Sequence, residues 1–461
     1  MAQARTSTQR HVEELDLLQD QPRGGDAAEE TLDESADPLE ESGRTIDSSE
    51  DESVDDMVVE DIEKFENSFV GINKRYRLIN RIGEGTFSTV YKAEDLEYYK
   101  YNNRWDIDER ERRKWSSPAR AKRSARKPHY VAIKKIYVTS SPIRIFNELE
   151  LLFDLKNSDS VCPLITAFRH QDQVVAVLPY FQHQDFRDYY KDMKISEMRL
   201  YMKSLLTALR AVHNRKILHR DVKPTNFLYN KWLNRGVLVD FGLAEREGTD
   251  WQQCNCTLTP EERRYKNTNS VWQQKVAAWD VTPSMPKTDT RSSRRANRAG
   301  TRGFRAPEVL MKCTQQTTII DMWSAGVILL TLLTRRFPFF HSADDIDALL
   351  EITTIFGRKK MKEAALLHGQ VFQTNIPSYS EYGHSLEKII LWCTGRTDSD
   401  KNAPKKELDD EEKDAVAFLY RLLETDPSKR ITADEALRHP FITKAYEESE
   451  AEDDVVDLVE V

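Results

Sequence analysis

The sequence predicts an α+β protein of two lobes, in which a small β-sheet lobe with one main helix is followed by a larger helical lobe. Residues 76–95 alternate apolar and polar side chains around two glycines, which predicts two strands joined by a tight turn. A further strand is expected at 130–137, and residues 143–155 have the apolar periodicity of a helix. Long helical patterns dominate from residue 197 onward, at 198–214, 321–333 and 411–424.

Both ends of the chain are predicted to be acidic tails. Residues 1–66 are rich in Asp, Glu, Ser and Gly, and they have no sustained helical or strand period, which is typical of disorder. Within them, residues 58–69 form an exception, because apolar side chains at helical spacing favour a helix that can dock on the folded body. The second acidic tail is expected at 443–461. The folded body therefore spans residues 67–442.

Composition excludes several classes of protein. The net charge of −9 gives no reason to expect direct, sequence-specific nucleic acid binding. Five scattered cysteines are typical of a reducing compartment and not of a disulfide framework. No stretch approaches the roughly 18 apolar residues of a membrane span, and the N-terminus lacks the apolar run of a signal peptide. We therefore expect an intracellular protein, neither secreted nor embedded in a membrane.

A set of short motifs follows the predicted glycine-rich turn in a fixed order. The turn alone is weak evidence, because Gly83 and Gly85 suit any tight hairpin. A lysine in a strand, a glutamate in a helix and three further motifs come after it: Lys134, Glu148, His219-Arg220-Asp221-Val222-Lys223-Pro224-Thr225-Asn226, Asp240-Phe241-Gly242 and Ala306-Pro307-Glu308. In this order they resemble the protein kinase superfamily over about residues 76–441. The resemblance implies the bilobal protein kinase fold and transfer of the ATP γ-phosphate to protein hydroxyl groups.

The resemblance assigns an ATP pocket. The backbone N–H groups of the glycine-rich hairpin approach the phosphates, and the linker between the lobes receives the adenine. Lys134 supplies a positive charge to the α- and β-phosphates and needs a carboxylate to hold it; we expect Glu148 and not Glu150, which faces elsewhere on the helix. The predicted ATP-binding residues are Ile82, Gly83, Gly85, Val90, Ala132, Lys134, Pro179 and Phe181.

The catalytic roles follow residue by residue. Asp221 is expected to orient and deprotonate the substrate hydroxyl, and Lys223, in the serine/threonine-kinase position, to neutralise the transferring phosphoryl group. Asn226 and Asp240 are expected to hold Mg²⁺. Because no catalytic residue is missing, a pseudokinase scaffold is the disfavoured alternative. Asp321 and a Glu308–Arg430 ion pair are expected to be structural.

The segment from Asp240 to Glu308 is too long for an ordinary activation segment, so a second, basic insertion is expected at about 246–296, besides a first at about 97–129. With the run of residues 296–308, the catalytic body resembles the cell-division-cycle seven kinases of fungi. That resemblance implies a nuclear kinase, activated by a regulatory subunit in S phase, that phosphorylates the MCM helicase. The alternative is another acidophilic or proline-directed cell-cycle kinase without an obligate subunit.

Two further features concern substrates and metals. Arg302 and Arg305 precede the Ala-Pro-Glu motif, where two guanidinium groups would select Asp, Glu or phosphoserine after the acceptor; an arginine at position 305 also has a purely structural interpretation. Cys254 and Cys256 resemble half a zinc site. The insertion has no further Cys or His before Glu308, so an intact site within the chain is not expected, and a metal shared with a partner stays open.

Overall fold

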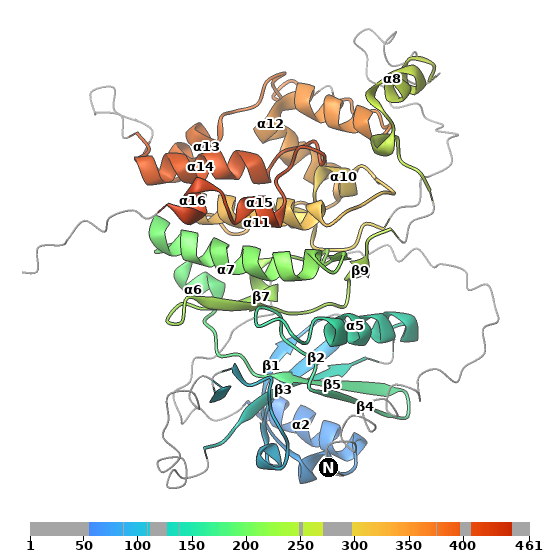
Figure 1. Ribbon diagram of the computed structural model, residues 1–461, viewed down its shortest axis with the longest axis vertical. Helices are drawn as coiled ribbons and strands as arrows, with labels where there is room; N and C mark the ends of the chain where they lie inside the picture. The colour runs from blue at the N-terminus through green and yellow to red at the C-terminus, as the bar shows by residue number, and fades with distance from the viewer. Residues whose placement is uncertain are drawn as a thin grey trace, which may run out of the picture.

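The computed structural model describes residues 55–110, 127–248, 252–270, 297–396 and 407–444, except residues 86, 108, 138 and 375. It has two lobes (Figure 1). The predicted tails, up to residue 54 and from residue 445, lie outside the described residues, as do the middle parts of both insertions.

The smaller lobe is a five-stranded antiparallel sheet in the order β1-β2-β3-β5-β4. The strands are β1 (Tyr76–Glu84), β2 (Ser88–Asp95), β3 (Tyr130–Ile136), β4 (Thr166–His170) and β5 (Gln173–Pro179). Successive side chains of a strand point to opposite faces, and β3 uses both. Val131 and Ile133 pack on one face with Phe65 of helix α2 (Asp56–Ser68), while Ile136 packs on the other with Leu149 of helix α5 (Pro142–Asp154).

Helix α2 places part of the predicted acidic tail in the folded body. Phe65 is fully buried, and its ring stacks on Tyr91 of β2 at a centroid distance of 5.2 Å. Asp61 pairs with Arg81 of β1 at 2.9 Å. The boundary predicted at residue 67 is therefore too late, because the apolar face of 58–69 outweighs the acidic composition around it.

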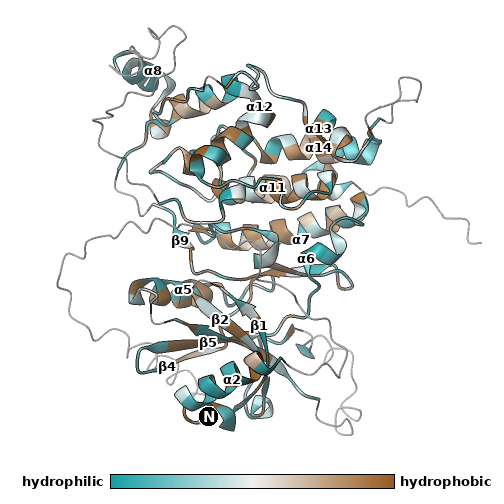
Figure 2. Cartoon of the chain, turned by 180° about the vertical axis from the view of Figure 1, so that it is seen from behind, coloured by the Kyte–Doolittle hydropathy of each residue, from teal (hydrophilic) through white to brown (hydrophobic). Residues whose placement is uncertain are grey.

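The larger lobe is mostly helical. Its helices are α6 (Phe186–Tyr189), α7 (Ile195–His213), α8 (Pro260–Thr268), α10 (Pro307–Leu310), α11 (Ile319–Thr334), α12 (Asp345–Leu367), α13 (Leu386–Cys393), α14 (Asp410–Leu422), α15 (Ala433–Ala436) and α16 (Pro440–Thr443). Two short antiparallel pairs face the smaller lobe: β6 (Ile217–Leu218) with β9 (Glu245–Arg246), and β7 (Phe227–Asn230) with β8 (Arg235–Leu238). Helix α11 is buried along almost its whole length and packs on α7 and α14 (Figure 2).

The α+β, two-lobed fold is thus confirmed. Helices α7, α11 and α14 lie within a few residues of the predicted helices, and α5 begins one residue before the predicted one. Strands β4 and β5 and helix α12 were not assigned from the sequence. Among the described helices, none is both long enough and apolar enough to span a bilayer.

The first insertion is tied down at both ends. Tyr98, near its start, is buried and stacks on His129, near its end, at a centroid distance of 3.6 Å. Trp105 packs edge-on against the same tyrosine. The insertion therefore leaves and rejoins the sheet at one place, which explains how β2 and β3 stay paired around it.

Replacing Phe65 by Ala should destabilise the protein by about 3–5 kcal/mol, because it leaves a cavity between α2 and the sheet. Denaturant unfolding of the purified chain measures this change. Met57→Ala on the same helix is the control, since Met57 is 65% exposed and should cost less than about 0.5 kcal/mol. Equal stability of the Phe65 variant and the wild type would show that α2 is not docked.

Candidate active site

An ion triad joins the two lobes, with Lys134 and Glu148 buried and Asp240 half-exposed. Lys134 Nζ lies 2.7 Å from Glu148 Oε1 on α5 and 2.9 Å from Asp240 Oδ1, which follows β8 in the larger lobe. Burial works to lower the pKa of Lys134, but Asp240 and Glu148 outweigh it, so the pKa lies above its usual value. The choice of Glu148 is confirmed, since Glu150 faces Arg246 instead at 3.9 Å.

The glycine-rich hairpin stands above this triad. Across the sheet, Gly83, Val90, Lys134 and Ala176 are register partners in one row, so the lysine lies beside the hairpin. A Cβ built on Gly83 or Gly85 would make only ordinary contacts, of 3.8 Å or more, and neither residue has a positive φ. The fold itself does not require glycine there. A close approach of phosphates to the backbone does require glycine, because a side chain would stand between them. Gly83 and Gly85 therefore fit the predicted binding of ATP.

The remaining ATP-pocket residues lie on the strands around the hairpin and at the linker. Ile82 precedes Gly83 in β1, and Ala132 shares a face of β3 with Lys134. Pro179 ends β5 and has no N–H, so only its carbonyl is available to accept a bond from adenine. The carbonyl of Phe181 lies 2.9 Å from His183 Nδ1. That leaves the N–H of Phe181 for the predicted contact with adenine.

The catalytic loop gathers its predicted residues around one carboxylate. Asp221 Oδ2 lies 3.0 Å from Lys223 Nζ and accepts a bond from Asn226 Nδ2 at 2.9 Å. Its Oδ1 accepts bonds from the N–H and hydroxyl of Thr301, at 2.8 and 2.7 Å. Burial works to raise the pKa of Asp221, but Lys223 and Thr301 outweigh it, and the pKa lies below its usual value. Asp221 is therefore an ionised carboxylate next to a lysine, which is the state that the predicted role of base requires.

Thr301 was not singled out from the sequence. Its hydroxyl also accepts a bond from Lys223 Nζ at 2.8 Å, so it links the base and the lysine. The only sequence signal was its place in the run before Ala-Pro-Glu. Because it binds both catalytic side chains, Thr301 couples the activation segment to the catalytic loop.

Asp321 holds the catalytic loop from below. This carboxylate is fully buried in α11 and accepts bonds from the N–H groups of His219 and Arg220, at 2.9 and 2.8 Å. His213 Nε2 lies 3.0 Å from the same carboxylate. Burial works to raise the pKa of Asp321, but His213 and the loop outweigh it, so the pKa is lowered. Arg220 has a left-handed φ of 69°, and these bonds offset that strain.

Asp240 lies where the two lobes meet, with its side chain half-exposed. Its φ is 62°, while Phe241 next to it is fully buried and packs on His219 at a centroid distance of 4.8 Å. Lys134 holds the pKa of Asp240 well below its usual value. Asn226 uses its Nδ2 on Asp221, which leaves its amide oxygen as the ligand atom. Carboxylate and amide oxygens fit a hard divalent cation, which would neutralise charge on the phosphates.

The end of the activation segment is pressed against this loop. Gly300 has a φ of +103°, and a Cβ there would lie 2.2 Å from the carbonyl oxygen of Arg220, so only glycine fits. Glu308 forms a bidentate pair with Arg430 at 2.6 and 2.9 Å, as predicted. Both side chains are almost completely buried, and the pair fixes α10 to the larger lobe.

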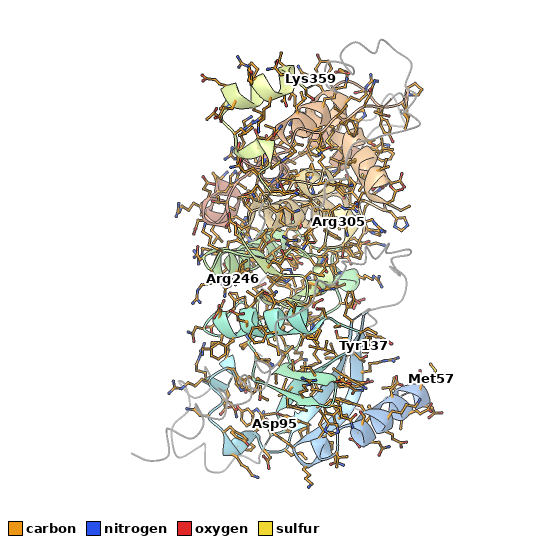
Figure 3. All side chains as sticks on the ribbon, turned by 90° about the vertical axis from the view of Figure 1, so that its right-hand side faces the viewer. Met57, Asp95, Tyr137, Arg246, Arg305 and Lys359 are labelled. Atoms are coloured by element: carbon orange, nitrogen blue, oxygen red, sulfur yellow. The ribbon has the colours of Figure 1, made fainter. Side chains whose placement is uncertain are left out.

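The two candidate substrate-reading arginines differ in their surroundings. Arg305 lies in the larger lobe (Figure 3); it donates to the Gly300 carbonyl at 2.7 Å and pairs with Asp345 at 2.8 Å. Arg298 pairs with the same aspartate. Arg302 begins a short turn directly after Thr301 and is partly exposed. Arg305 therefore has a structural role in the chain, and Arg302 is the direct neighbour of Thr301, which binds Asp221.

Comparison with known proteins agrees with this geometry. The model of the protein kinase domain matches residues 76–262 and 273–442. The cell cycle serine/threonine-protein kinase hsk1 of Schizosaccharomyces pombe is 47% identical over 87% of this chain and 80% of its own length. A probable cell division control protein 7 homolog of Encephalitozoon cuniculi is 40% identical over 80% of this chain and 92% of its own length. The human cell division cycle 7-related protein kinase is 27% identical over 83% of this chain and 92% of its own length.

Replacing Asp240 by Asn should abolish phosphoryl transfer, because it removes the half-exposed carboxylate that fits the metal. We expect the rate to fall by at least about a hundredfold, as for other single preorganised charges. Radiolabelled transfer to a protein substrate measures the rate, and thermal unfolding with and without nucleotide checks the fold. Wild-type turnover in a folded Asp240→Asn protein would refute the assignment.

Proposed function

The chain belongs to the protein kinase family, among the serine/threonine kinases related to cell division control protein 7, and on this premise we propose that it triggers DNA replication in the nucleus. In this proposal a regulatory subunit activates the kinase in S phase, and MCM helicase subunits are its substrates. The observation that carries the proposal is the complete catalytic geometry in a chain similar to these kinases over most of its length.

We propose Mg²⁺ as the metal that accompanies ATP. The ligand atoms offered by Asp240 and Asn226 are oxygens, which suit Mg²⁺ better than soft metals. With the metal bound, the negative charge of the phosphates is offset next to Lys134. The protein's own contribution is to hold Asp221 ionised and aimed by Thr301, Lys223 and Asn226.

The exposed apolar side chains of α5 support the proposal that a regulatory subunit binds this helix. Glu148 reaches Lys134 in the single chain, so formation of the ion pair does not itself require a partner. The helix that carries Glu148 nonetheless exposes Ile143 by 80% and Phe153 by 41%. The Ser141 side chain makes no capping bond at its start. A subunit that covered these apolar side chains would hold Glu148 in place for more of the time.

An acidic preference is supported by the charges around the acceptor site. Three guanidinium groups, of Arg298, Arg302 and Arg305, lie in the segment that carries Thr301, and Asp345 compensates part of their charge. Arg302 directly follows Thr301, whose hydroxyl binds Asp221, so the segment carries this guanidinium next to the catalytic loop. We propose that it selects Asp, Glu or phosphoserine after the phosphorylated residue.

The chain alone should be much less active than the complex with its subunit. We expect co-expression with the subunit to raise kcat by about 5- to 150-fold, which corresponds to a shift of about 1–3 kcal/mol in the equilibrium between inactive and active conformations. Ile143→Asp should reduce this activation, because it puts a charge on the exposed face of α5. Val70→Asp is the control, since Val70 is 88% exposed and lies beyond α2. Equal specific activity with and without the subunit would contradict the dependence.

Peptides with Asp or phosphoserine after the target serine should be preferred over the same peptides with Ala. Bonds to a charged group contribute about 1.5–3 kcal/mol, so we expect a kcat/KM ratio of about 10 to 100 that falls with added salt. Arg302→Glu should remove this preference. Arg264→Glu, an equal charge change at an exposed position of α8, should not.

A wild-type enzyme that favoured proline after the acceptor, or ignored charge there, would point instead to the proline-directed cell-cycle kinase. That outcome would leave the phosphotransfer assignment intact. The pairing of Arg305 with Asp345 is the observation that favours this second candidate, because it gives Arg305 a role that needs no acidic substrate.

A further inference from the structure

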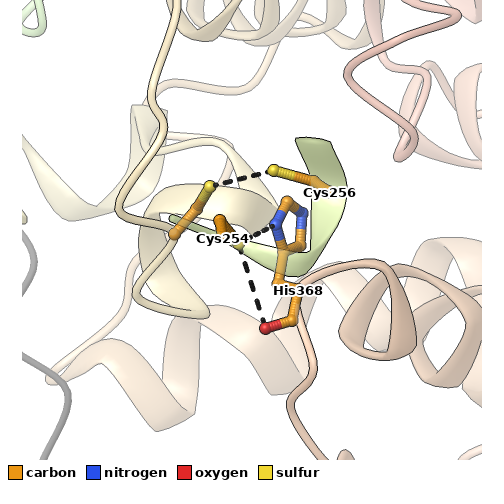
Figure 4. Close-up of side chains that lie close together, drawn as sticks. Cys254, Cys256 and His368 are labelled. Carbon is orange, nitrogen blue, oxygen red and sulfur yellow. Dashed lines mark hydrogen bonds between the residues drawn. The ribbon is translucent and has the colours of Figure 1, made fainter. Parts of the chain in front are cut away.

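Two cysteines of the activation segment meet two residues from elsewhere in the larger lobe (Figure 4). This cysteine cluster consists of Cys254, Cys256, Cys313 and His368, whose ligand atoms lie within 4.8 Å of one another. The expectation that the chain holds no intact ligand set was therefore wrong, because it counted ligands only within the insertion. The cluster contacts the activation segment from residue 254 onward. Different contacts hold the residues before it, which directly follow the Asp-Phe-Gly motif.

Strand β9 brings Glu245 against the catalytic loop. It pairs with β6, where Leu218 is the register partner of Glu245, and the catalytic loop begins directly after Leu218. Glu245 Oε2 lies 2.8 Å from Arg220 Nη2. The side chain of Arg220 is only 3% exposed, whereas that of Glu245 is 35% exposed. A buried guanidinium is costly unless an anion neutralises it, and Glu245 supplies that negative charge.

The same carboxylate also binds the far end of the activation segment. Asn297 Nδ2 donates to Glu245 Oε1 at 2.6 Å, so the two oxygens of Glu245 bind Asn297 and Arg220 separately. Gln316 Nε2 donates to the carbonyl of Asn297 at 2.6 Å and so holds this residue from the other side. Glu245 therefore joins the start of the activation segment to the residues that lead into Thr301.

These contacts bear on Asp221 from two directions. Arg220 directly precedes Asp221 in the catalytic loop. Thr301 lies at the other end of the path through Asn297, and its N–H and hydroxyl both donate to Asp221 Oδ1. Loss of the Glu245 carboxylate would thus release both the residue before Asp221 and the segment that aims its side chain.

A charge in this place has a known use in protein kinases. Phosphorylation orders many activation segments, because the new phosphate pairs with an arginine. Glu245 makes the same kind of contact with an unmodified side chain, since it places a negative charge from the activation segment on a buried arginine of the catalytic loop.

We propose that Glu245 takes the place of this phosphate. Its carboxylate holds the catalytic loop and both ends of the activation segment in their active arrangement, without phosphorylation of the segment. Glu245 is a positioning residue, because it acts on Asp221 through Arg220 and Asn297. This role is separate from that of a regulatory subunit on α5, which concerns Glu148 in the other lobe.

Replacing Glu245 by Gln removes the charge and keeps the size of the side chain. We expect kcat for dephosphorylated casein to fall at least about fivefold, with an almost unchanged KM for ATP. Glu245→Asp, which keeps the charge, should retain more activity than Glu245→Gln. A Glu245→Gln enzyme with the kcat of the wild type, or a Glu245→Asp enzyme no faster than Glu245→Gln, would overturn the proposal.

Glu247→Gln is the matched control. Glu247 lies two residues further along the same segment and pairs at 3.8 Å with Lys216, whose side chain is 76% exposed. Because such an exposed pair contributes little, the same change of charge should alter kcat by less than about twofold. An equal loss of kcat in both variants would show a general effect of charge on this segment and would overturn the specific role of Glu245.

Phosphatase treatment tests the proposal on the wild-type chain, so it does not depend on a variant folding. Protein shown by mass spectrometry to carry no phosphate within residues 240–308 should reach its full initial rate without a lag. A rate more than about fivefold lower, restored by preincubation with ATP, would overturn the proposal, because activity would then depend on an added phosphate.

Hydrogen–deuterium exchange provides a readout that does not require activity. In Glu245→Gln, the amides of residues 217–222 and 297–305 should exchange faster than in the wild type, while those of α11 stay protected and show that the lobe is folded. Glu247→Gln should exchange like the wild type. Unchanged exchange in both regions of Glu245→Gln would overturn the proposal. Failure of the replication-initiation role would change none of these results, because no experiment uses a helicase substrate or a regulatory subunit.

Discussion

The arrangement of the catalytic centre depends on the hydrogen bonds that the buried carboxylate of Asp321 accepts from the catalytic loop. This carboxylate has no exposure to solvent, yet it stays ionised because two backbone N–H groups and His213 face it. Those N–H groups belong to His219 and Arg220, directly before the base Asp221. The strained φ of Arg220 persists because these bonds hold it. The almost fully buried helix α11 therefore determines where Asp221, the predicted base, stands.

The other catalytic groups are positioned from this fixed loop outward. His219 packs on Phe241, which sets the turn that presents Asp240 to Lys134. Lys134 in turn reaches Glu148 on α5, the helix that packs on the sheet face opposite α2. Lys134 thus forms ion pairs with one carboxylate of the smaller lobe and one of the larger lobe. Glu148 lies on α5, a helix with exposed apolar side chains. Among these catalytic contacts, the Lys134–Glu148 pair is therefore the one that a partner bound to α5 would influence.

The sequence was sufficient wherever chemistry restricts both residue type and order. Lys134, Glu148, Asp221 and Asp240 were all singled out from the sequence, because phosphate, metal and proton transfer each require a particular functional group at a particular element, and the structure joins Lys134 to both Glu148 and Asp240. Contacts between segments distant in sequence were not predictable in this way. Asp345, which compensates two arginines, and His368, which joins the cysteine cluster, carry no local signal. Helix α2 was only partly foreseen, because its acidic composition indicated disorder while its apolar spacing indicated docking.

Replacement of Asp321 by Asn tests this account most directly, because it keeps the size of the side chain but turns one acceptor oxygen into an N–H donor. That donor would oppose the N–H of His219 or Arg220, at a cost of about 1–3 kcal/mol for an unsatisfied buried group. Steady-state kinetics should then give a reduced kcat with an almost unchanged KM for ATP, since Asp321 touches none of the proposed ATP-pocket residues. A folded Asp321→Asn enzyme with the kcat of the wild type would contradict the claim that this carboxylate sets the catalytic geometry.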